Sequence, residues 1–140
     1  MTTLAEIEEN FALFDDWDGR YDYLIELGRS LPPFPETERT DANLVRGCQS
    51  RVWLVCRLDN GRLHLAIDSD ALIVRGLAAI VLAAYEGKTP EEVLSLDTLA
   101  LFERLGLLAH LSPTRGNGLR AMIERIRECA RAAIESAPRS

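Results

Sequence analysis

The sequence is short of the residues on which several large classes of protein depend. Its 140 residues contain only three cysteines, and these show no paired spacing, so the sequence indicates neither a disulfide framework nor a Cys-x-x-Cys metal site. Basic residues are outnumbered, with 16 Lys and Arg against 22 Asp and Glu, which leaves a formal net charge of −6. A nucleic-acid surface needs clustered Lys and Arg to displace counterions. The composition therefore predicts no nucleic-acid partner.

Long hydrophobic runs are also missing. The most apolar stretch, residues 71–85, is interrupted by Arg75 and is too short to cross a hydrocarbon layer of about 30 Å. No N-terminal stretch joins a basic start to an apolar run, so we expect neither a signal peptide nor association with a membrane. Together with the unpaired cysteines, this pattern favours a reducing, cytoplasmic setting.

Familiar catalytic and cofactor motifs are absent from the sequence as well. It contains no glycine-rich phosphate loop, no His-x-x-x-His pair and no Gly-x-Ser-x-Gly nucleophile elbow. Neither His64 nor His110 lies at a separation from Cys48 in the sequence that would indicate a catalytic pair. This disfavours a self-sufficient Cys–His hydrolase. We therefore expect no metal site and no bound cofactor.

The periodicity of the apolar residues predicts an α+β fold in a single domain over residues 1–140. Thr3 is expected to cap a first N-terminal helix, and a second helix should open at Asp16 or Trp17. Ser69 or Asp70 is expected to cap a buried central helix over residues 71–85. Shorter helices should follow near residues 89 and 101. The final helix is expected to begin after a loop over residues 112–118, with Asn117 as its cap.

The turn signal Asn60-Gly61 predicts a β-hairpin and also fixes its register. It places Cys56 opposite Leu65 and Arg57 opposite His64. One face of the hairpin is then entirely apolar, and a slip of one residue would destroy that agreement. The residues expected on this buried face are Leu54, Cys56, Leu58, Leu63, Leu65 and Ile67. Residues 43–46 are expected to add a short third strand to this small antiparallel sheet.

Cys48 stands apart from the apolar patterns that surround the other two cysteines. It follows Gly47, which frees the backbone for a tight turn, and it directly precedes a β-prone stretch. Arg46 and Arg51 lie close to it in sequence, and nearby positive charge lowers the pKa of a thiol. These features predict a reactive thiol at a loop tip. From residue types and spacing alone, a loop cysteine without a role stays open as the alternative.

Residues 43–53, which surround Cys48, resemble the signature of the SufE family of sulfur-acceptor proteins. Further blocks resemble the same family in the same order, so that the resemblance covers nearly the whole chain. These blocks are residues 21–28, residues 68–71 with 73–77, and residues 111–115 with 118–119. The central and C-terminal parts look as much like the CsdE branch of the family as like the SufE branch.

The resemblance implies a SufE/IscU-like fold, with helices covering the small sheet, and a function in sulfur transfer. Cys48 would accept persulfide sulfur from a cysteine desulfurase, stimulate that enzyme, and pass the sulfur to an iron–sulfur cluster scaffold. Pyridoxal phosphate would reside on the desulfurase, which could be of the SufS or the CsdA type. The chain would then be an accessory protein rather than a stand-alone enzyme.

Further residues of the matching blocks receive supporting roles. Arg115 is expected near the Cys48 loop, where its charge would stabilise a thiolate or persulfide, and Asp70 is expected to restrain the loop. Arg51, with Arg46, would dock an acidic or mixed rim of the desulfurase. Structural roles stay open, because Asp70 is also a good helix cap and Arg115 would suit a solvated loop.

Two other functions stay open beside sulfur transfer. The chain could be a non-catalytic interaction module in which Cys48 is incidental. It could also be a thiol peroxidase, which would need a resolving thiol close to Cys48. Cys56 is poorly placed for that because the hairpin register buries it, and Cys129 borders the apolar stripe of the final helix. We therefore assign structural roles to Cys56 and Cys129, and sulfur transfer to Cys48 alone.

Overall fold

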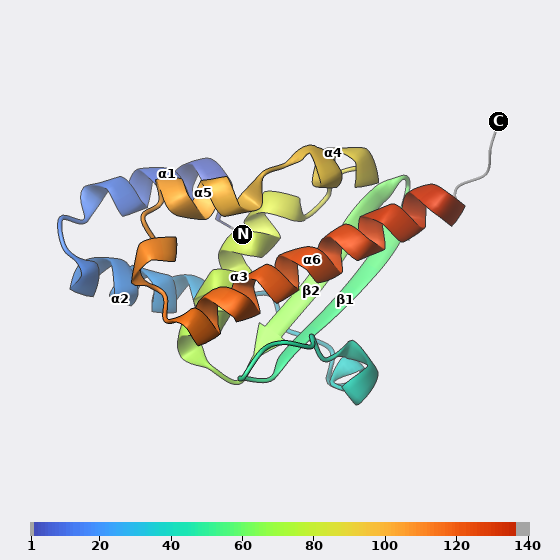
Figure 1. Cartoon of the computed structure of the whole chain (residues 1–140), viewed down its shortest axis with the longest axis horizontal. Helices are drawn as coiled ribbons and strands as arrows, with labels where there is room; N and C mark the ends of the chain where they lie inside the picture. The colour runs from blue at the N-terminus through green and yellow to red at the C-terminus, as the bar shows by residue number, and fades with distance from the viewer. Residues whose placement is uncertain (1, 137–140) are drawn as a thin grey trace.

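Helices surround a two-stranded antiparallel sheet in the computed structural model, which describes residues 2–136 (Figure 1). The predicted α+β class is therefore confirmed. In chain order the elements are α1 (Leu4–Leu13), α2 (Trp17–Arg29), the 3₁₀ turns η1 (Glu36–Glu38) and η2 (Asp41–Asn43), β1 (Val52–Asp59), β2 (Arg62–Ser69), α3 (Leu72–Tyr85), α4 (Pro90–Ser95), α5 (Thr98–Arg104), the 3₁₀ turn η3 (Leu108–His110) and α6 (Pro113–Ser136).

The first two helices begin where the sequence predicts, and the structure shows that both Thr3 and Asp16 are their caps. The Thr3 hydroxyl accepts a hydrogen bond from the backbone N–H of Glu6 at 3.2 Å. The Asp16 carboxylate accepts one from the N–H of Gly19 at 2.8 Å. Each bond satisfies a donor that the first turn of a helix leaves unpaired.

The hairpin forms in the predicted register, with Cys56 opposite Leu65 and Arg57 opposite His64. Two residues are exceptions to the predicted burial: Cys56 is only half-buried, and 47% of the surface of Leu58 is exposed. Leu58 lies one pair from the turn on β1. Its partner Leu63 is instead covered by the segment after α3, where the Lys88 carbonyl accepts the Leu63 N–H at 2.8 Å.

The expected third strand over residues 43–46 does not form. The chain is still in the η2 turn at residue 43, so that only a short segment runs beside β1. This segment makes one isolated bridge, between Leu44 and Trp53, and the Val45 N–H donates to the Val52 carbonyl at 2.8 Å. Within residues 2–136 the sheet has two strands rather than three.

Two helices cover the hairpin and thereby position the site. Helix α3 lies against β2, and the long helix α6 crosses the hairpin diagonally on its β1 side (Figure 1). Most side chains of α3 are buried, as the apolar run predicts. No helix of residues 2–136 has the length and apolar character needed to cross a bilayer.

The predicted caps of α3 and α6 are wrong. Neither Ser69 nor Asp70 occupies the cap position of α3, which is Ala71 and has no side-chain bond. Helix α6 begins at Pro113 rather than after Asn117. Proline suits the first position of a helix because it lacks the N–H that would stay unpaired there. Gly116 and Gly118 thus lie inside a helix that was predicted to begin only after residue 117.

Candidate functional site

The Cys48 loop, defined here as residues 46–50, connects the end of the η2 segment to β1. Gly47 has a φ of 91°, a backbone conformation that favours glycine. On the N-terminal side, the bond between Val45 and Val52 anchors the loop to the sheet. The predicted turn before the strand is therefore present, with Cys48 at its centre.

Asp70 and Ser69 anchor the other end of the loop through the backbone of Arg51. The Arg51 N–H donates to the Asp70 carboxylate at 3.1 Å, and the Asp70 N–H donates back to the Arg51 carbonyl at 3.3 Å. The Ser69 hydroxyl donates to the same carbonyl at 2.7 Å. The Asp70 side chain is thus directed at the loop anchor, which explains why it does not cap α3.

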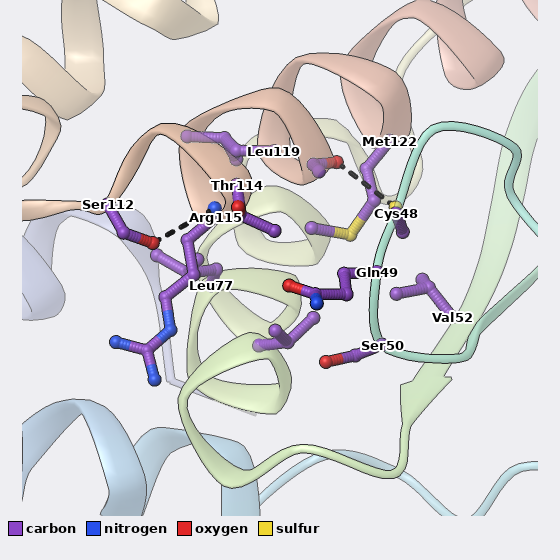
Figure 2. A pocket seen from close by; sticks show the side chains of 12 residues that line it. Cys48, Gln49, Ser50, Val52, Leu77, Ser112, Thr114, Arg115, Leu119 and Met122 are labelled. Carbon is purple, nitrogen blue, oxygen red and sulfur yellow. Dashed lines mark hydrogen bonds between the residues drawn. The ribbon is translucent and has the colours of Figure 1, made fainter.

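One contact holds the loop itself against α6. The Cys48 thiol donates to the Gly118 carbonyl at an Sγ–O distance of 3.5 Å (Figure 2). Within residues 2–136 it is the only hydrogen bond made by the five loop residues. A Cβ added to Gly118 would lie 3.5 Å from the Cys48 sulfur, so glycine leaves open the space next to the thiol. Both ends of the loop are therefore anchored, whereas its middle depends on a weak thiol bond.

Cys48 lines a pocket of about 370 Å³ between its own loop, α3 and the first turns of α6 (Figure 2). Most of the lining is apolar or uncharged, and Arg115 is the only charged residue in it among the described residues. The lining residues are Cys48, Gln49, Ser50, Val52, Val74, Leu77, Ser112, Thr114, Arg115, Gly118, Leu119 and Met122. Sequence reasoning predicted a buried central helix over residues 71–85 but did not predict that Val74 and Leu77 of this helix line the pocket.

Burial raises the pKa of the Cys48 thiol above its ordinary value, since the half-buried site disfavours the charged thiolate. The expectation that the flanking arginines lower this pKa is therefore wrong for the conformation seen here. Arg46 and Arg51 are both exposed to solvent, where their charge is screened. In this conformation the thiol is a weak nucleophile.

Alkylation of Cys48 should reveal this protection. Because the thiolate is the reactive form, iodoacetamide at pH 8 should modify Cys48 at least several-fold more slowly in the native protein than in protein unfolded with urea. The native rate should still be rising with pH above pH 9. Mass spectrometry of the Cys48 peptide over time measures both rates. Equal rates in the native and unfolded proteins would contradict the raised pKa.

Arg115 lines the same pocket as Cys48 but does not contact it. It lies in the first turn of α6, where its backbone N–H donates to the Ser112 hydroxyl at 3.3 Å. Figure 2 shows its guanidinium across the pocket, pointing away from Cys48. The expected neighbourhood of Arg115 and the Cys48 loop is thus present, without a direct bond to the thiol.

Comparison with known proteins shows which family this architecture belongs to. The sequence model of the SufE family, described as an Fe-S metabolism associated domain, matches residues 5–130. The chain belongs to the SufE family. An uncharacterized SufE-like protein of Rhizobium meliloti is 49% identical over 131 residues, which cover 91% of this chain and 94% of that protein.

Two further similar proteins extend the comparison. An uncharacterized SufE-like protein of Rhizobium etli is 48% identical over 135 residues, covering 94% of this chain and 91% of that protein. The solution structure of a hypothetical protein from Thermus thermophilus superimposes with a TM-score of 0.77 at 26% identity, covering 95% and 96% of the two chains. The fold is thus that of a SufE-family protein along nearly its full length.

A buried ion-pair cluster lies beside Ser69 and Asp70, which anchor the Cys48 loop of this SufE-family chain. The sequence analysis did not predict this cluster. Asp68 precedes the anchoring residue Ser69, and only 12% of its side chain is exposed. Its carboxylate lies 2.6 Å from the Arg39 guanidinium and 3.0 Å from that of Arg75. The Arg39 guanidinium also stacks on Trp53 of β1, 5.0 Å from the ring centroid. The cluster thereby ties the η1–η2 segment and α3 to the strand end that holds the loop.

Within residues 2–136, no three or more His, Cys, Asp or Glu side chains are grouped so as to hold a metal ion.

Proposed function

We propose that this SufE-family protein is a sulfur acceptor, which takes persulfide sulfur from a pyridoxal-phosphate-dependent cysteine desulfurase onto Cys48. It then delivers the sulfur for iron–sulfur cluster assembly. Two features support the proposal: the resemblance of residues 43–53 to the family signature, which implies that Cys48 is the acceptor, and the place of Cys48 in the lining of a largely uncharged pocket, which is the observation that carries it. The association of the family with Fe-S metabolism agrees with this role.

The transfer is a thiol–disulfide-type exchange. The Cys48 thiolate attacks the outer sulfur of the persulfide on the desulfurase cysteine. A new bond forms between the Cys48 sulfur and the transferred sulfur, while the bond to the desulfurase sulfur breaks. The desulfurase cysteine leaves as a thiolate. Cys48 then carries the persulfide, and no net oxidation or reduction takes place.

The half-buried position of Cys48 in this structure suits protection of a persulfide on Cys48 but not the formation of that persulfide. A persulfide left in solvent would be lost to cellular reductants, whereas the pocket beside Cys48 has room for one further sulfur atom. For the attack, however, the thiol must come within bonding distance of the partner's persulfide. We therefore propose that the loop extends on docking, which breaks the single bond to Gly118 while the anchors at Val45 and Arg51 hold.

A desulfurase assay with and without a blocked Cys48 tests this function. The cognate desulfurase is incubated with free cysteine and a reductant, and the rate of alanine production is measured. Unmodified protein should raise the rate, and protein alkylated at Cys48 should leave the rate at that of the desulfurase alone. Stimulation that survives complete alkylation would instead identify an interaction module in which Cys48 is incidental.

Arg115→Ala should reduce sulfur uptake on Cys48 about threefold to tenfold without a comparable loss of stability. Among the described residues that line the pocket, Arg115 supplies the only positive charge, and it is exposed, so its removal affects bound anionic sulfur more than packing. Arg120→Ala is the matched control, because Arg120 is exposed on the same helix and does not line the pocket. Sulfur uptake is measured by mass spectrometry, and Tm by circular dichroism. The role fails if Arg115→Ala and Arg120→Ala take up sulfur equally fast.

Charge reversal at Arg51 should weaken binding of the desulfurase. The Arg51 side chain is exposed beside the loop, whereas its backbone makes the anchoring bonds, so Arg51→Glu preserves the anchor. We expect Kd to rise about tenfold in low salt, and the difference from the wild type to shrink at high ionic strength because salt screens exposed charge. Calorimetric titration measures both values. An affinity indifferent to the reversal and to salt would leave docking to apolar contacts.

A further inference from the structure

Gly118 is a buried glycine inside α6, and its backbone conformation does not require a glycine. Its backbone is helical and does not have a positive φ, so a residue with a side chain could adopt it. Glycine in the interior of a helix lowers stability relative to alanine, because it loses more conformational freedom on folding. The presence of glycine here therefore calls for an explanation from its surroundings.

The packing around the unloaded Cys48 thiol does not require a glycine either. A Cβ added to Gly118 would lie 3.5 Å from the Cys48 Sγ, 3.9 Å from its Cβ and 4.0 Å from its Cα. These are ordinary van der Waals distances, so alanine would fit against the thiol without displacing the Cys48 loop. The space that glycine leaves is thus more than the thiol needs, and Cys48 and Gly118 both line the pocket.

A persulfide on Cys48 would need more space than the thiol. Its outer sulfur lies about 2.05 Å from Sγ, the length of a sulfur–sulfur bond. A methyl group at position 118 would already be in contact with Sγ, so an outer sulfur on the α6 side would come closer to that methyl group than van der Waals contact allows. With glycine, the α6 side of Sγ stays open.

We propose that Gly118 is a positioning residue, which keeps open the space beside Cys48 that the outer sulfur of a persulfide occupies. This inference rests on the proposed sulfur-acceptor function, and it assigns the seat of the carried sulfur to the side of the pocket formed by α6. The same residue holds the unloaded thiol, through the bond from Sγ to its carbonyl at 3.5 Å (Figure 2). Alanine at position 118 would keep that carbonyl but fill the seat.

A small reagent that adds one sulfur to Cys48 tests the seat without a desulfurase. Methyl methanethiosulfonate reacts with the Cys48 thiolate, which attacks its divalent sulfur. A bond forms between the two sulfurs, methanesulfinate leaves, and Cys48 carries an S–S–CH₃ group. Dithiothreitol then removes this group by thiol–disulfide exchange. Digestion with trypsin and mass spectrometry of peptide 47–51 measure the rate of removal.

The expected result separates Gly118→Ala from a matched glycine variant. Gly116→Ala is the control, because Gly116 is buried in the same helix but does not line the pocket, and its added Cβ would meet only the end of the Arg120 side chain. Dithiothreitol should clear the S–S–CH₃ group at least about fivefold faster from Gly118→Ala than from the wild type or Gly116→Ala, because overpacking displaces the loaded loop into solvent. Before loading, iodoacetamide should modify Cys48 at rates within about twofold in all three proteins, because alanine fits against the thiol.

Two outcomes would overturn the proposal. Equal removal of the S–S–CH₃ group from Gly118→Ala and the wild type would show that the outer sulfur does not use the space beside Gly118. Iodoacetamide alkylation accelerated as much as the removal would show that alanine disturbs the loop itself. Circular dichroism and Tm check that the variants fold. If Gly118→Ala does not fold, the wild type decides: equal removal rates from its native and urea-unfolded forms would overturn the seat.

Loading by a desulfurase distinguishes failure of this inference from failure of the proposed function. With desulfurase and free cysteine, the persulfide on Cys48 should be lost to dithiothreitol faster in Gly118→Ala than in Gly116→Ala. If the wild type takes up no sulfur from the desulfurase, the proposed function fails, whatever the S–S–CH₃ group shows. If the wild type takes up sulfur and both variants lose it at the same rate, sulfur acceptance stands and the role of Gly118 fails.

Discussion

Cys48→Ser should abolish both sulfur uptake and stimulation of the desulfurase. Serine cannot form a persulfide, so the acceptor chemistry is lost completely rather than slowed. We expect the desulfurase rate with a saturating amount of the variant to equal that of the desulfurase alone, within error. The fold should persist, because Cys48 is half-buried and its side chain makes only one weak bond to the rest of residues 2–136, to Gly118.

Two controls make the result interpretable. Cys129→Ser removes a half-buried thiol from the same chain, and it should keep full stimulation because Cys129 lies outside the Cys48 pocket. Circular dichroism and Tm show whether each variant folds. The assignment fails if folded Cys48→Ser still stimulates the desulfurase, or if Cys129→Ser loses stimulation to the same extent.

Asp68→Ala should produce the largest loss of stability among the substitutions near the site. It removes the shared partner of two arginines that are themselves only partly exposed, 25% for Arg39 and 31% for Arg75. Removing one member of a buried ion pair is typically worth 3–5 kcal/mol, and access of the arginines to water reduces that. We expect a loss of about 2–3 kcal/mol in the free energy of unfolding, measured by urea denaturation.

Glu36→Ala is the matched control for this cluster. Glu36 is the second partner of Arg39, at 2.9 Å, but 83% of its side chain is exposed. Exposed pairs contribute about 0–1 kcal/mol, so the control should change stability by less than about 0.5 kcal/mol. If both variants are equally stable, the Asp68 cluster does not hold the loop anchor as described.

Local sequence signals predicted those parts of the fold that short-range chemistry determines. The turn Asn60-Gly61 fixed the register of the hairpin because only one pairing buries a continuous apolar face. Thr3 and Asp16 located two helix starts because each cap satisfies a donor within its own first turn. The family signature around Cys48 pointed to a residue that lines the pocket between its own loop, α3 and α6.

The predictions of the α3 cap and of the start of α6 were wrong because these features depend on contacts between parts of the chain that are far apart in sequence. The sequence cannot show that Asp70 bonds to Arg51 instead of capping α3, because that choice depends on how the loop meets the strand end. Gly118 looked like a loop residue, but packing of α6 against the Cys48 loop keeps it helical. Ser112-Pro113 was a usable start signal for α6, and two following glycines obscured it.

The pKa values of the thiols could likewise not be predicted from the sequence. Flanking arginines suggested an activated Cys48, but burial of the side chain decides the direction of its pKa. Local sequence therefore indicated which thiol carries the family signature but not how reactive each thiol is.

The most direct test of the central claim is to map where sulfur binds. The wild-type protein is incubated with its desulfurase and free cysteine, separated from small molecules, alkylated, digested and analysed by mass spectrometry. We predict that one additional sulfur, about 32 Da, is found on the peptide that contains Cys48, and that the peptides of Cys56 and Cys129 gain none. Sulfur found mainly on Cys56 or Cys129, with Cys48 unmodified, would contradict the account.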